Sequence, residues 1–160
     1  SGSGAIAVAL DKISGAEVTA VEIDETAFSY LETNVKGNNS SVKPVMADAL
    51  EICETFADGE LDLIVSNPPY IKSADIETLQ KEVRLEPRLA LDGGEDGYDF
   101  YREIVNRWSR KLKKGGALAF ELGEGQADAV KALMTEQGFS DFKISLDFGG
   151  VQRAIIGTLL

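Results

Sequence analysis

The sequence has no histidine and only one cysteine among its 160 residues. Without histidine, the imidazole bases of Ser-His and Cys-His catalysis and the usual zinc sites are excluded, and we expect no metal centre. The single cysteine, Cys53, cannot form an internal disulfide and suits a reducing compartment such as the cytoplasm. No apolar run approaches the roughly 20 residues that a spanning helix needs, so we expect no membrane partner.

Basic residues are also scarce: 16 Lys and Arg stand against 27 Asp and Glu, giving a net charge of −11. Nucleic acid is therefore not an expected partner, because phosphate binding relies on clustered Lys and Arg. The main cluster of basic residues either complements the dipole at the C-terminal end of a predicted helix or forms a binding patch, and the first interpretation is favoured. It consists of Arg107, Arg110, Lys111, Lys113 and Lys114.

The length suits one domain with a sizeable core, and 44% hydrophobic with 27% charged residues is typical of a soluble globular protein. Apolar runs alternate with amphipathic segments, which predicts an α/β fold with a doubly wound, mostly parallel sheet. We expect strands at residues 17–24, 42–46, 61–65 and 117–122, then an antiparallel pair at 142–146 and 152–159. Helices are expected around residues 5–10, 27–35, 50–56, 75–83 in part, 98–112 (closed by Gly115-Gly116) and 130–134.

The most informative stretch is Asn67-Pro68-Pro69-Tyr70, which follows an apolar run at residues 61–66. Neither proline can donate to a sheet ladder, and each biases its predecessor toward extended geometry. The pattern predicts a buried strand that stops at a rigid loop, with the Asn67 amide pointing outward at the carboxyl edge of the sheet. Ligands bind at that edge in open α/β sheets. The alternative is a proline-terminated loop without a ligand.

A glycine-rich turn opens the sequence and two acidic strand ends follow it. Gly2 and Gly4 lead into a helix-forming segment, which lets a ligand approach the backbone near a helix N-terminus, unless the turn is only a linker. Glu22 ends a strand about 20 positions later, where a carboxylate commonly bonds a ribose. Asp24 could do the same or cap the next helix. Asp48 could accept from an adenine amino group or cap its own helix.

The segment after Tyr70 is long and polar, and residues 86–94 (EPRLALDGG) are predicted to form an ordered loop. Loops of this length inside compact domains are usually functional. Asp92, Glu95 and Asp96 either contact a substrate or are solvated surface charges. Trp108 lies on the apolar stripe of its helix, so we expect it in the core.

The order of these features resembles the class I S-adenosylmethionine-dependent methyltransferases. The second block, residues 86–102 (EPRLALDGGEDGYDFYR), together with Asn67-Pro68-Pro69-Tyr70-Ile71, is similar to the release-factor glutamine methyltransferases, and the resemblance covers essentially the whole chain. In that family S-adenosylmethionine donates a methyl group to a glutamine side-chain amide nitrogen and leaves as S-adenosylhomocysteine. The glutamine belongs to the Gly-Gly-Gln motif of peptide chain release factors.

The resemblance also implies roles for individual residues. It implies that the cofactor is bound by Gly2, Gly4, Glu22, Ile23, Asp48, Ala49 and Asn67. Glu22 would hold the ribose and Asp48 would meet the adenine. The glutamine amide would be held by Asn67, Pro68, Pro69 and Tyr70. The family's first strand and its N-terminal substrate-docking domain are not in this sequence, so residues 1–160 are expected to be a catalytic-domain fragment.

Three other functions fit part of the pattern. An adenine amino-group methyltransferase acting on DNA or RNA would use the same acceptors, but it needs a flipped base and basic contacts that the acidic composition disfavours. A nicotinamide-dependent oxidoreductase could use Gly2, Gly4 and Glu22, yet the two prolines have no role there. The chain could also be a module that only binds a cofactor or a partner.

Overall fold

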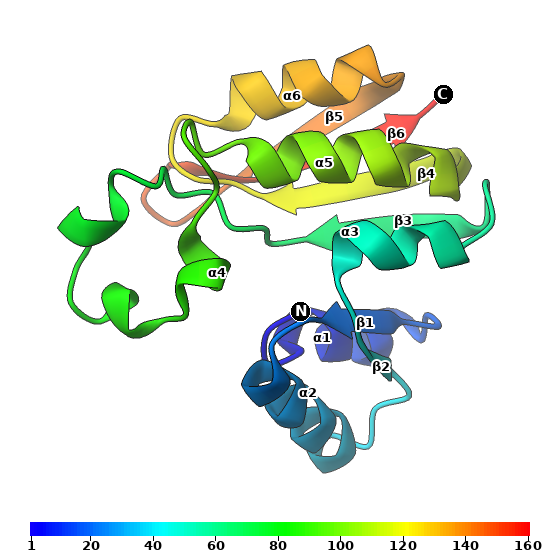
Figure 1. Cartoon of the computed structure of the whole chain (residues 1–160). Helices are drawn as coiled ribbons and strands as arrows, with labels where there is room; N and C mark the ends of the chain where they lie inside the picture. The colour runs from blue at the N-terminus through cyan, green and yellow to red at the C-terminus, as the bar shows by residue number, and fades with distance from the viewer. The chain divides into compact units, whose positions relative to one another are not determined.

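The structure is a computed structural model that describes all residues, Ser1–Leu160. The chain divides into two compact units, Ser1–Thr55 and Phe56–Leu160 (Figure 1). None of its helices has the length and apolar character that a membrane span requires. Each unit has its own sheet and its own buried residues.

The first unit alternates helices and strands in a parallel arrangement. Its elements are α1 (Ala5–Ser14), β1 (Thr19–Glu22), α2 (Glu25–Gly37), β2 (Lys43–Met46) and α3 (Ala49–Ile52), with a 3₁₀ turn at Cys53–Thr55. β1 and β2 pair in parallel, from Thr19 opposite Lys43 to Glu22 opposite Met46. A small core joins the two helices to the strands, and it consists of Ala7, Ala20, Leu31 and Val42.

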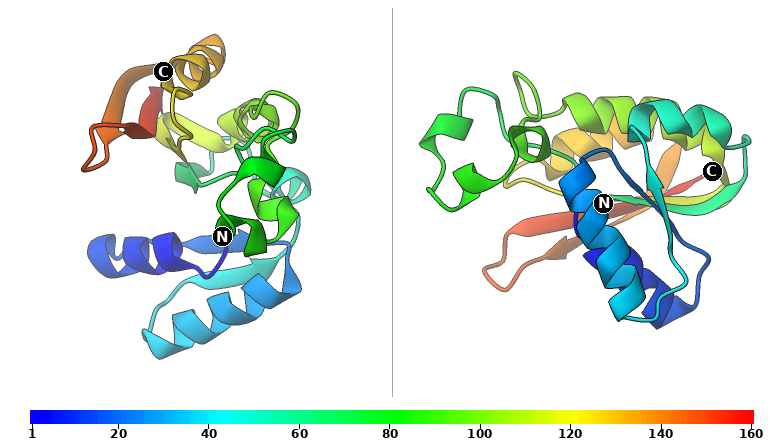
Figure 2. Two further views of the ribbon diagram at one scale, coloured as in Figure 1. Left: turned by 90° about the vertical axis from the view of Figure 1, so that its left-hand side faces the viewer. Right: turned by 60° about the horizontal axis from the view of Figure 1, so that its bottom comes forward.

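The second unit is built on a four-stranded sheet in the order β3-β4-β6-β5. Its strands are β3 (Leu61–Ser66), β4 (Leu112–Glu121), β5 (Phe139–Leu146) and β6 (Gln152–Leu159), and its helices are α4 (Arg88–Leu91), α5 (Asp99–Trp108) and α6 (Ala127–Glu136). β3 and β4 are parallel, whereas β6 pairs antiparallel with both β4 and β5. α5 and α6 lie side by side along this sheet (Figures 1 and 2).

The core of the second unit follows the apolar stripes of the helices. Tyr101, Val105 and Trp108 on α5 are buried, as are Val130 and Met134 on α6. They lie on the i, i+4 spacing that places one helix face against a sheet. The prediction that Trp108 belongs to the core is confirmed.

The predicted α/β class, with parallel pairs and an antiparallel pair at the C-terminal end, is confirmed. The strands form two sheets rather than one, because no strand of the chain pairs with the second edge of β1 or of β3. On β3 the apolar side chains of Leu63 and Val65 are 42% and 37% exposed. No residue of β3 is buried, so the expectation of a buried strand is wrong.

Three local predictions are corrected. Gly115 and Gly116 do not close a helix: α5 ends at Trp108, a 3₁₀ turn covers Ser109–Lys111, and both glycines lie inside β4. They occupy the register shift where β3 passes from pairing with Leu112 to pairing with Ala117, which explains why glycine is tolerated in a strand. Residues 50–56 contain only the short α3 and its 3₁₀ turn, and residues 75–83 contain 3₁₀ turns but no α-helix.

Candidate functional site

The glycine turn at the start of the first unit has one open and one crowded position. Gly2 and Gly4 have φ angles of 55° and 81°, which favour glycine. A Cβ on Gly2 would meet nothing within 4 Å, whereas a Cβ on Gly4 would lie 2.3 Å from Leu31 Cδ1. Gly4 therefore permits the turn to pack on α2, and Gly2 leaves the backbone accessible. No side chain caps the N-terminus of α1, so its first N–H groups are available to a ligand.

The Glu22 carboxylate holds this turn. Its Oε2 accepts from the Gly2 N–H at 2.6 Å, and its Oε1 accepts from the Ile23 and Asp24 N–H groups at 2.9 Å each. Burial raises the pKa of Glu22, whereas hydrogen bonds from the Asp24 and Gly2 N–H groups favour the ionised carboxylate and lower it. Glu22 is thus an ionised acceptor directly beside the open glycine.

The other acidic candidates of this unit are helix caps. Asp24 accepts from the Ala27 N–H at 2.8 Å and begins α2, so the capping interpretation is confirmed. Asp48 caps α3 by accepting from the Leu50 N–H at 2.7 Å through Oδ1. Because Glu22 pairs with Met46 and the Ala47 N–H donates to the Glu22 carbonyl, Asp48 and Ala49 follow at the same carboxyl edge as Glu22 and the exposed Ile23.

In the second unit, Asn67-Pro68-Pro69-Tyr70 follows the last residue of β3 as predicted. Asn67 is exposed, Pro68 is buried, and Pro69 and Tyr70 are partly buried. No hydrogen bond from the chain engages the Asn67 side chain. Its amide therefore stands at the carboxyl end of a parallel strand with both its oxygen and its nitrogen free for a ligand.

A second segment pairs with the residues after Tyr70. The Ile71 N–H donates to the Leu91 carbonyl at 3.0 Å, and the Gly93 N–H donates to the Ile71 carbonyl at 2.8 Å. Asp92 reinforces the pairing by accepting from the Ser73 hydroxyl. The Ser73 hydroxyl and then the Gly94 N–H are the main causes that hold the pKa of Asp92 below its usual range. Asp92 therefore has a structural role in this loop, which neither of the two interpretations given above includes.

Three buried glycines surround Tyr70, two of them at its backbone and one at its ring. A Cβ on Gly93 would lie 2.7 Å from Tyr70 Cα, one on Gly97 would lie 2.6 Å from the Tyr70 carbonyl oxygen, and one on Gly123 would lie 2.9 Å from Tyr70 Cδ2. The loop is consequently fixed by close backbone contacts that no larger residue would allow. Burial, followed by the charge of Glu121, raises the pKa of the Tyr70 hydroxyl, so it is a neutral phenol at neutral pH.

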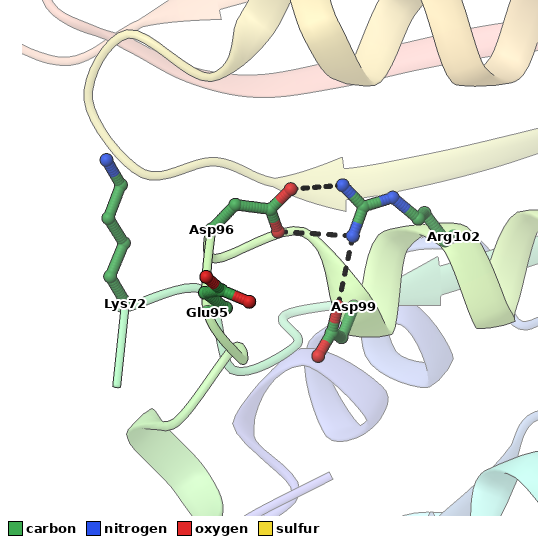
Figure 3. Close-up of a pocket in the computed structure, with 5 residues that line it drawn as sticks. All are labelled: Lys72, Glu95, Asp96, Asp99 and Arg102. Carbon is green, nitrogen blue, oxygen red and sulfur yellow. Dashed lines mark hydrogen bonds and ion pairs between the residues drawn. The ribbon is translucent and has the colours of Figure 1, made fainter. Parts of the chain in front are cut away.

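An open hollow of about 470 Å³ lies beside this loop, and its five lining residues are all charged (Figure 3). Arg102 binds Asp96 and Asp99, which attaches the loop before α5 to the first turns of that helix. The Arg102 guanidinium holds the pKa of Asp96 below its usual range. Glu95 and Lys72 are exposed at the rim. Within this hollow Asp96 is thus part of an ion pair.

Gln126 was not identified from the sequence. Its side chain is only 8% exposed, and its Nε2 donates to the Tyr70 carbonyl at 3.1 Å and to the Gly97 carbonyl at 3.2 Å. A glutamine beside a helix start carries no sequence signal for such a contact. The favoured helix-end interpretation of the basic residues holds only for Arg107, which lies in the last turn of α5. The buried Lys111 pairs with Asp58, and Lys113, which lies on β4, pairs with Asp62.

In each unit the candidate residues lie at the carboxyl end of a parallel strand, the edge at which open α/β sheets bind ligands such as nucleoside cofactors. Solved structures share the fold. A methyltransferase from Pyrococcus furiosus superposes with a TM-score of 0.72 at 25% identity, over 96% of this chain and 68% of that one. The hMettl16 catalytic domain in complex with a MAT2A 3′UTR hairpin shares the fold with a TM-score of 0.71 at 19% identity, over 99% of this chain and 61% of that one.

Residues 1–86 match the methyltransferase small domain, and the chain belongs to that family. Two curated relatives bear the name release factor glutamine methyltransferase. The one from Geobacter sulfurreducens is 44% identical over 160 residues, covering 99% of this chain and 55% of the relative. The one from Bradyrhizobium diazoefficiens is 42% identical over 159 residues, covering 96% and 52%. The chain thus spans about half the length of the curated relatives it matches.

Family membership implies S-adenosylmethionine as the methyl donor. The first unit fits such a group on three grounds. Gly2 leaves open space where a ligand can reach the backbone, Glu22 is ionised beside it, and Asp48 uses only Oδ1 for capping. Dihydroxy and amino groups of a nucleoside are the donors that such carboxylate oxygens accept.

Proposed function

We propose that residues 1–160 form the catalytic domain of a methyltransferase that modifies the Gly-Gly-Gln glutamine of peptide chain release factors. The observation that carries the proposal is the exposed, unengaged Asn67 amide on a rigidly supported loop at the end of β3. The names of the relatives support the same substrate. A substrate-docking domain would lie in the half of the relatives that this chain does not match. Because termination occurs on cytoplasmic ribosomes, the protein would act in the cytoplasm.

The substrate nitrogen is a poor nucleophile because its lone pair is delocalised into the amide carbonyl. Asn67 Oδ1 and the Pro68 carbonyl would each accept one of its two hydrogens. These contacts orient the remaining lone pair and stabilise the positive charge that develops on nitrogen. The stiffness of the two prolines keeps both acceptors in place before the substrate arrives. Tyr70 would pack its ring against the planar amide.

The first unit would bind the cofactor, which supplies an electrophilic methyl group on sulfonium. Glu22 would accept from the ribose hydroxyl groups, and Asp48 would accept from the adenine amino group through its second oxygen. Ile23 and Ala49 would border the adenine, and the Gly2 and Gly4 turn would pass the backbone close to the cofactor.

No strong base is needed before transfer. The amide nitrogen would attack while still protonated and lose a proton to solvent afterwards, so the reaction proceeds without an imidazole. Tyr70 does not serve as a base at neutral pH, because its pKa is raised above the ordinary value for a phenol. Positioning of two reactants about 3 Å apart would supply several kcal/mol of the rate enhancement.

The test is transfer of labelled methyl from S-adenosylmethionine by the full-length protein. The substrates are a release factor, the same factor with the Gly-Gly-Gln glutamine changed to alanine, an RNA and a DNA. We expect label on the normal factor alone. Label on the alanine factor would place the methyl elsewhere on the protein, and label on nucleic acid would favour adenine methylation. Cofactor binding without any transfer would indicate a binding module.

A further inference from the structure

We infer that Gln126 is the positioning residue that fixes the backbone of the Asn67-Pro68-Pro69-Tyr70 loop for catalysis. The inference rests on the proposed function, because it concerns the loop that would hold the substrate amide. Gln126 lies 56 residues from Tyr70 in the sequence and directly precedes α6. Its side chain does not cap that helix. It is turned instead toward the loop.

The Gln126 amide makes three hydrogen bonds to the backbone inside the protein. Its Nε2 donates to the Tyr70 carbonyl at 3.1 Å and to the Gly97 carbonyl at 3.2 Å. Its Oε1 accepts from the Gly123 N–H at 2.9 Å. The Tyr101 hydroxyl donates to the Glu121 carbonyl at 2.8 Å and lies 3.2 Å from Gln126 Oε1, so its one hydrogen is at most shared with Gln126. Both donors of the primary amide and one of its acceptor positions are therefore used.

The partners also fix which way the amide points. Tyr70 and Gly97 present carbonyl oxygens, which only accept, whereas Gly123 presents an N–H, which only donates. Only an oxygen toward Gly123 and a nitrogen toward Tyr70 satisfies them all. Gln126 therefore joins the substrate loop, the loop before α5 and the end of β4 in one arrangement.

No other side chain holds the Tyr70 carbonyl among the hydrogen bonds of the structure, and the neighbouring glycines leave no space for a replacement. A Cβ on Gly97 or Gly123 would itself approach Gln126, to 3.2 Å from Nε2 or 2.6 Å from Oε1. The Tyr70 peptide group follows the acceptors Asn67 and Pro68 along a short, stiff segment. A shift at Tyr70 would move those acceptors, and misplacement by about 1 Å can cost about 100-fold in rate.

The test compares Gln126→Glu with a matched control, Lys111→Met, in the full-length protein. Gln126→Glu keeps Oε1, removes both N–H donors and places a second acceptor oxygen, negatively charged when ionised, against the Tyr70 and Gly97 carbonyls. Lys111 is also buried, with 4% exposure, and its Nζ donates to the Phe56 carbonyl and to Asp58 Oδ1, both at 2.8 Å. The control variant therefore also removes buried hydrogen bonds, but away from the Tyr70 loop. Gln126→Asn, which keeps the amide but shortens it, is the second variant if Gln126→Glu does not fold.

Two readouts are combined. The first is methyl transfer to the release factor, for which we expect kcat to fall roughly 10–100-fold in Gln126→Glu with the Kd for S-adenosylmethionine unchanged. The second is hydrogen exchange at the Ile71 and Gly93 amides, which should become faster in Gln126→Glu and not in Lys111→Met. A purely structural role would lower the melting temperature of both variants and leave kcat per folded molecule unchanged in both.

Wild-type kcat in folded Gln126→Glu, or equal loss of kcat in both variants, would overturn the inference. Its failure is distinguishable from failure of the proposed function, in which the wild-type protein itself would not methylate release factor. In that case the exchange measurement decides: faster exchange confined to the Gln126 variants supports the positioning role, and unchanged exchange contradicts it.

Discussion

The two units support their candidate ligand turns in opposite ways. In the first unit one carboxylate, Glu22, holds the glycine turn, and Gly2 has open space where a side chain would be. In the second unit a paired segment, three crowded glycines and the neutral amide of Gln126 all fix the backbone around Tyr70. The first turn leaves its backbone open to a ligand, whereas the second presents side-chain and carbonyl acceptors from a backbone that cannot shift.

The difference fits the two tasks that we propose. A cofactor is bound by many contacts along an accessible chain, so an open glycine serves it. Methyl transfer to an amide depends instead on aiming one lone pair, which requires acceptors that are fixed before the substrate binds. Substitutions in the first unit should therefore change mainly the cofactor affinity, and substitutions in the second unit should change mainly the turnover.

The largest effect is expected for Asn67→Ala, which removes one oriented acceptor from the rigid loop. Turnover should fall by about 10²–10³, as for removal of a single charge-stabilising group, while the Kd for S-adenosylmethionine stays unchanged. Steady-state kinetics and calorimetric titration measure the two quantities. Asn106→Ala, which removes an exposed amide that accepts from Gln137, is the control and should leave both unchanged. Near-normal turnover of Asn67→Ala would contradict the assignment.

The next effect tests crowding around Tyr70 by comparing two glycines with similar backbones. Gly97 and Gly125 have φ angles of 82° and 77°, but only Gly97 is crowded, and nothing lies within 4 Å of a Cβ on Gly125. Gly125→Ala should cost only the left-handed strain of about 1–2 kcal/mol. Gly97→Ala should add about 1–3 kcal/mol for overpacking against the Tyr70 carbonyl.

Urea unfolding of the two variants measures this difference in the free energy of unfolding. We also expect slower methyl transfer by Gly97→Ala alone. Equal destabilisation of the two variants would mean that the loop around Tyr70 can shift, and the contrast between the units would then fail.

A smaller effect is expected in the first unit for Glu22→Gln. The change removes the ionised acceptor beside Gly2, and we expect the Kd for S-adenosylmethionine to rise roughly 10–100-fold, since hydrogen bonds to charged groups are worth about 1.5–3 kcal/mol. Turnover at saturating cofactor should change little. Glu25→Gln, at the exposed start of α2, is the matched control. A cofactor affinity unaffected by Glu22→Gln would show that this carboxylate serves only the turn.

The smallest effect concerns Asp11, which accepts from the Ser40 and Ser41 hydroxyls. These hydrogen bonds are the main causes that lower the pKa of Asp11 from 3.8 to about 2. Because the folded pKa is depressed, the carboxylate stabilises the fold above about pH 4, and this contribution is lost as the pH falls toward 2. Melting curves should show a gap between wild type and Asp11→Asn at pH 5 that closes near pH 2. A constant gap would contradict the role of the charge.

Much of this arrangement is predictable from the sequence where local chemistry decides it. The apolar run before Asn67 and the two prolines predict a strand that stops at an exposed amide, and the structure has both. Asp24 is followed by a helix-forming segment, and it caps α2, which is one of the two roles predicted for it. These features depend on neighbours in the sequence, so a single sequence contains them.

The rest depends on contacts between distant segments. Gln126 donates to the Tyr70 carbonyl, 56 residues away in the sequence, and residue 97 must be glycine because a Cβ there would clash with the same carbonyl. No local sequence pattern reveals either contact. The sequence does not distinguish a helix end from a strand irregularity at Gly115 and Gly116, because glycine is typical of both, and only the register between β3 and β4 separates them. The exposure of Leu63 and Val65 likewise follows from which strands pair, not from their apolar character.

The most direct test of the central claim is to locate the transferred methyl group by tandem mass spectrometry. A release factor incubated with the full-length protein and S-adenosylmethionine would be digested and compared with factor incubated with the Asn67→Ala variant. The account predicts a methyl group on the side-chain amide nitrogen of the Gly-Gly-Gln glutamine, strongly reduced with the variant. A methyl group at any other residue, or equal methylation by the variant, would contradict it.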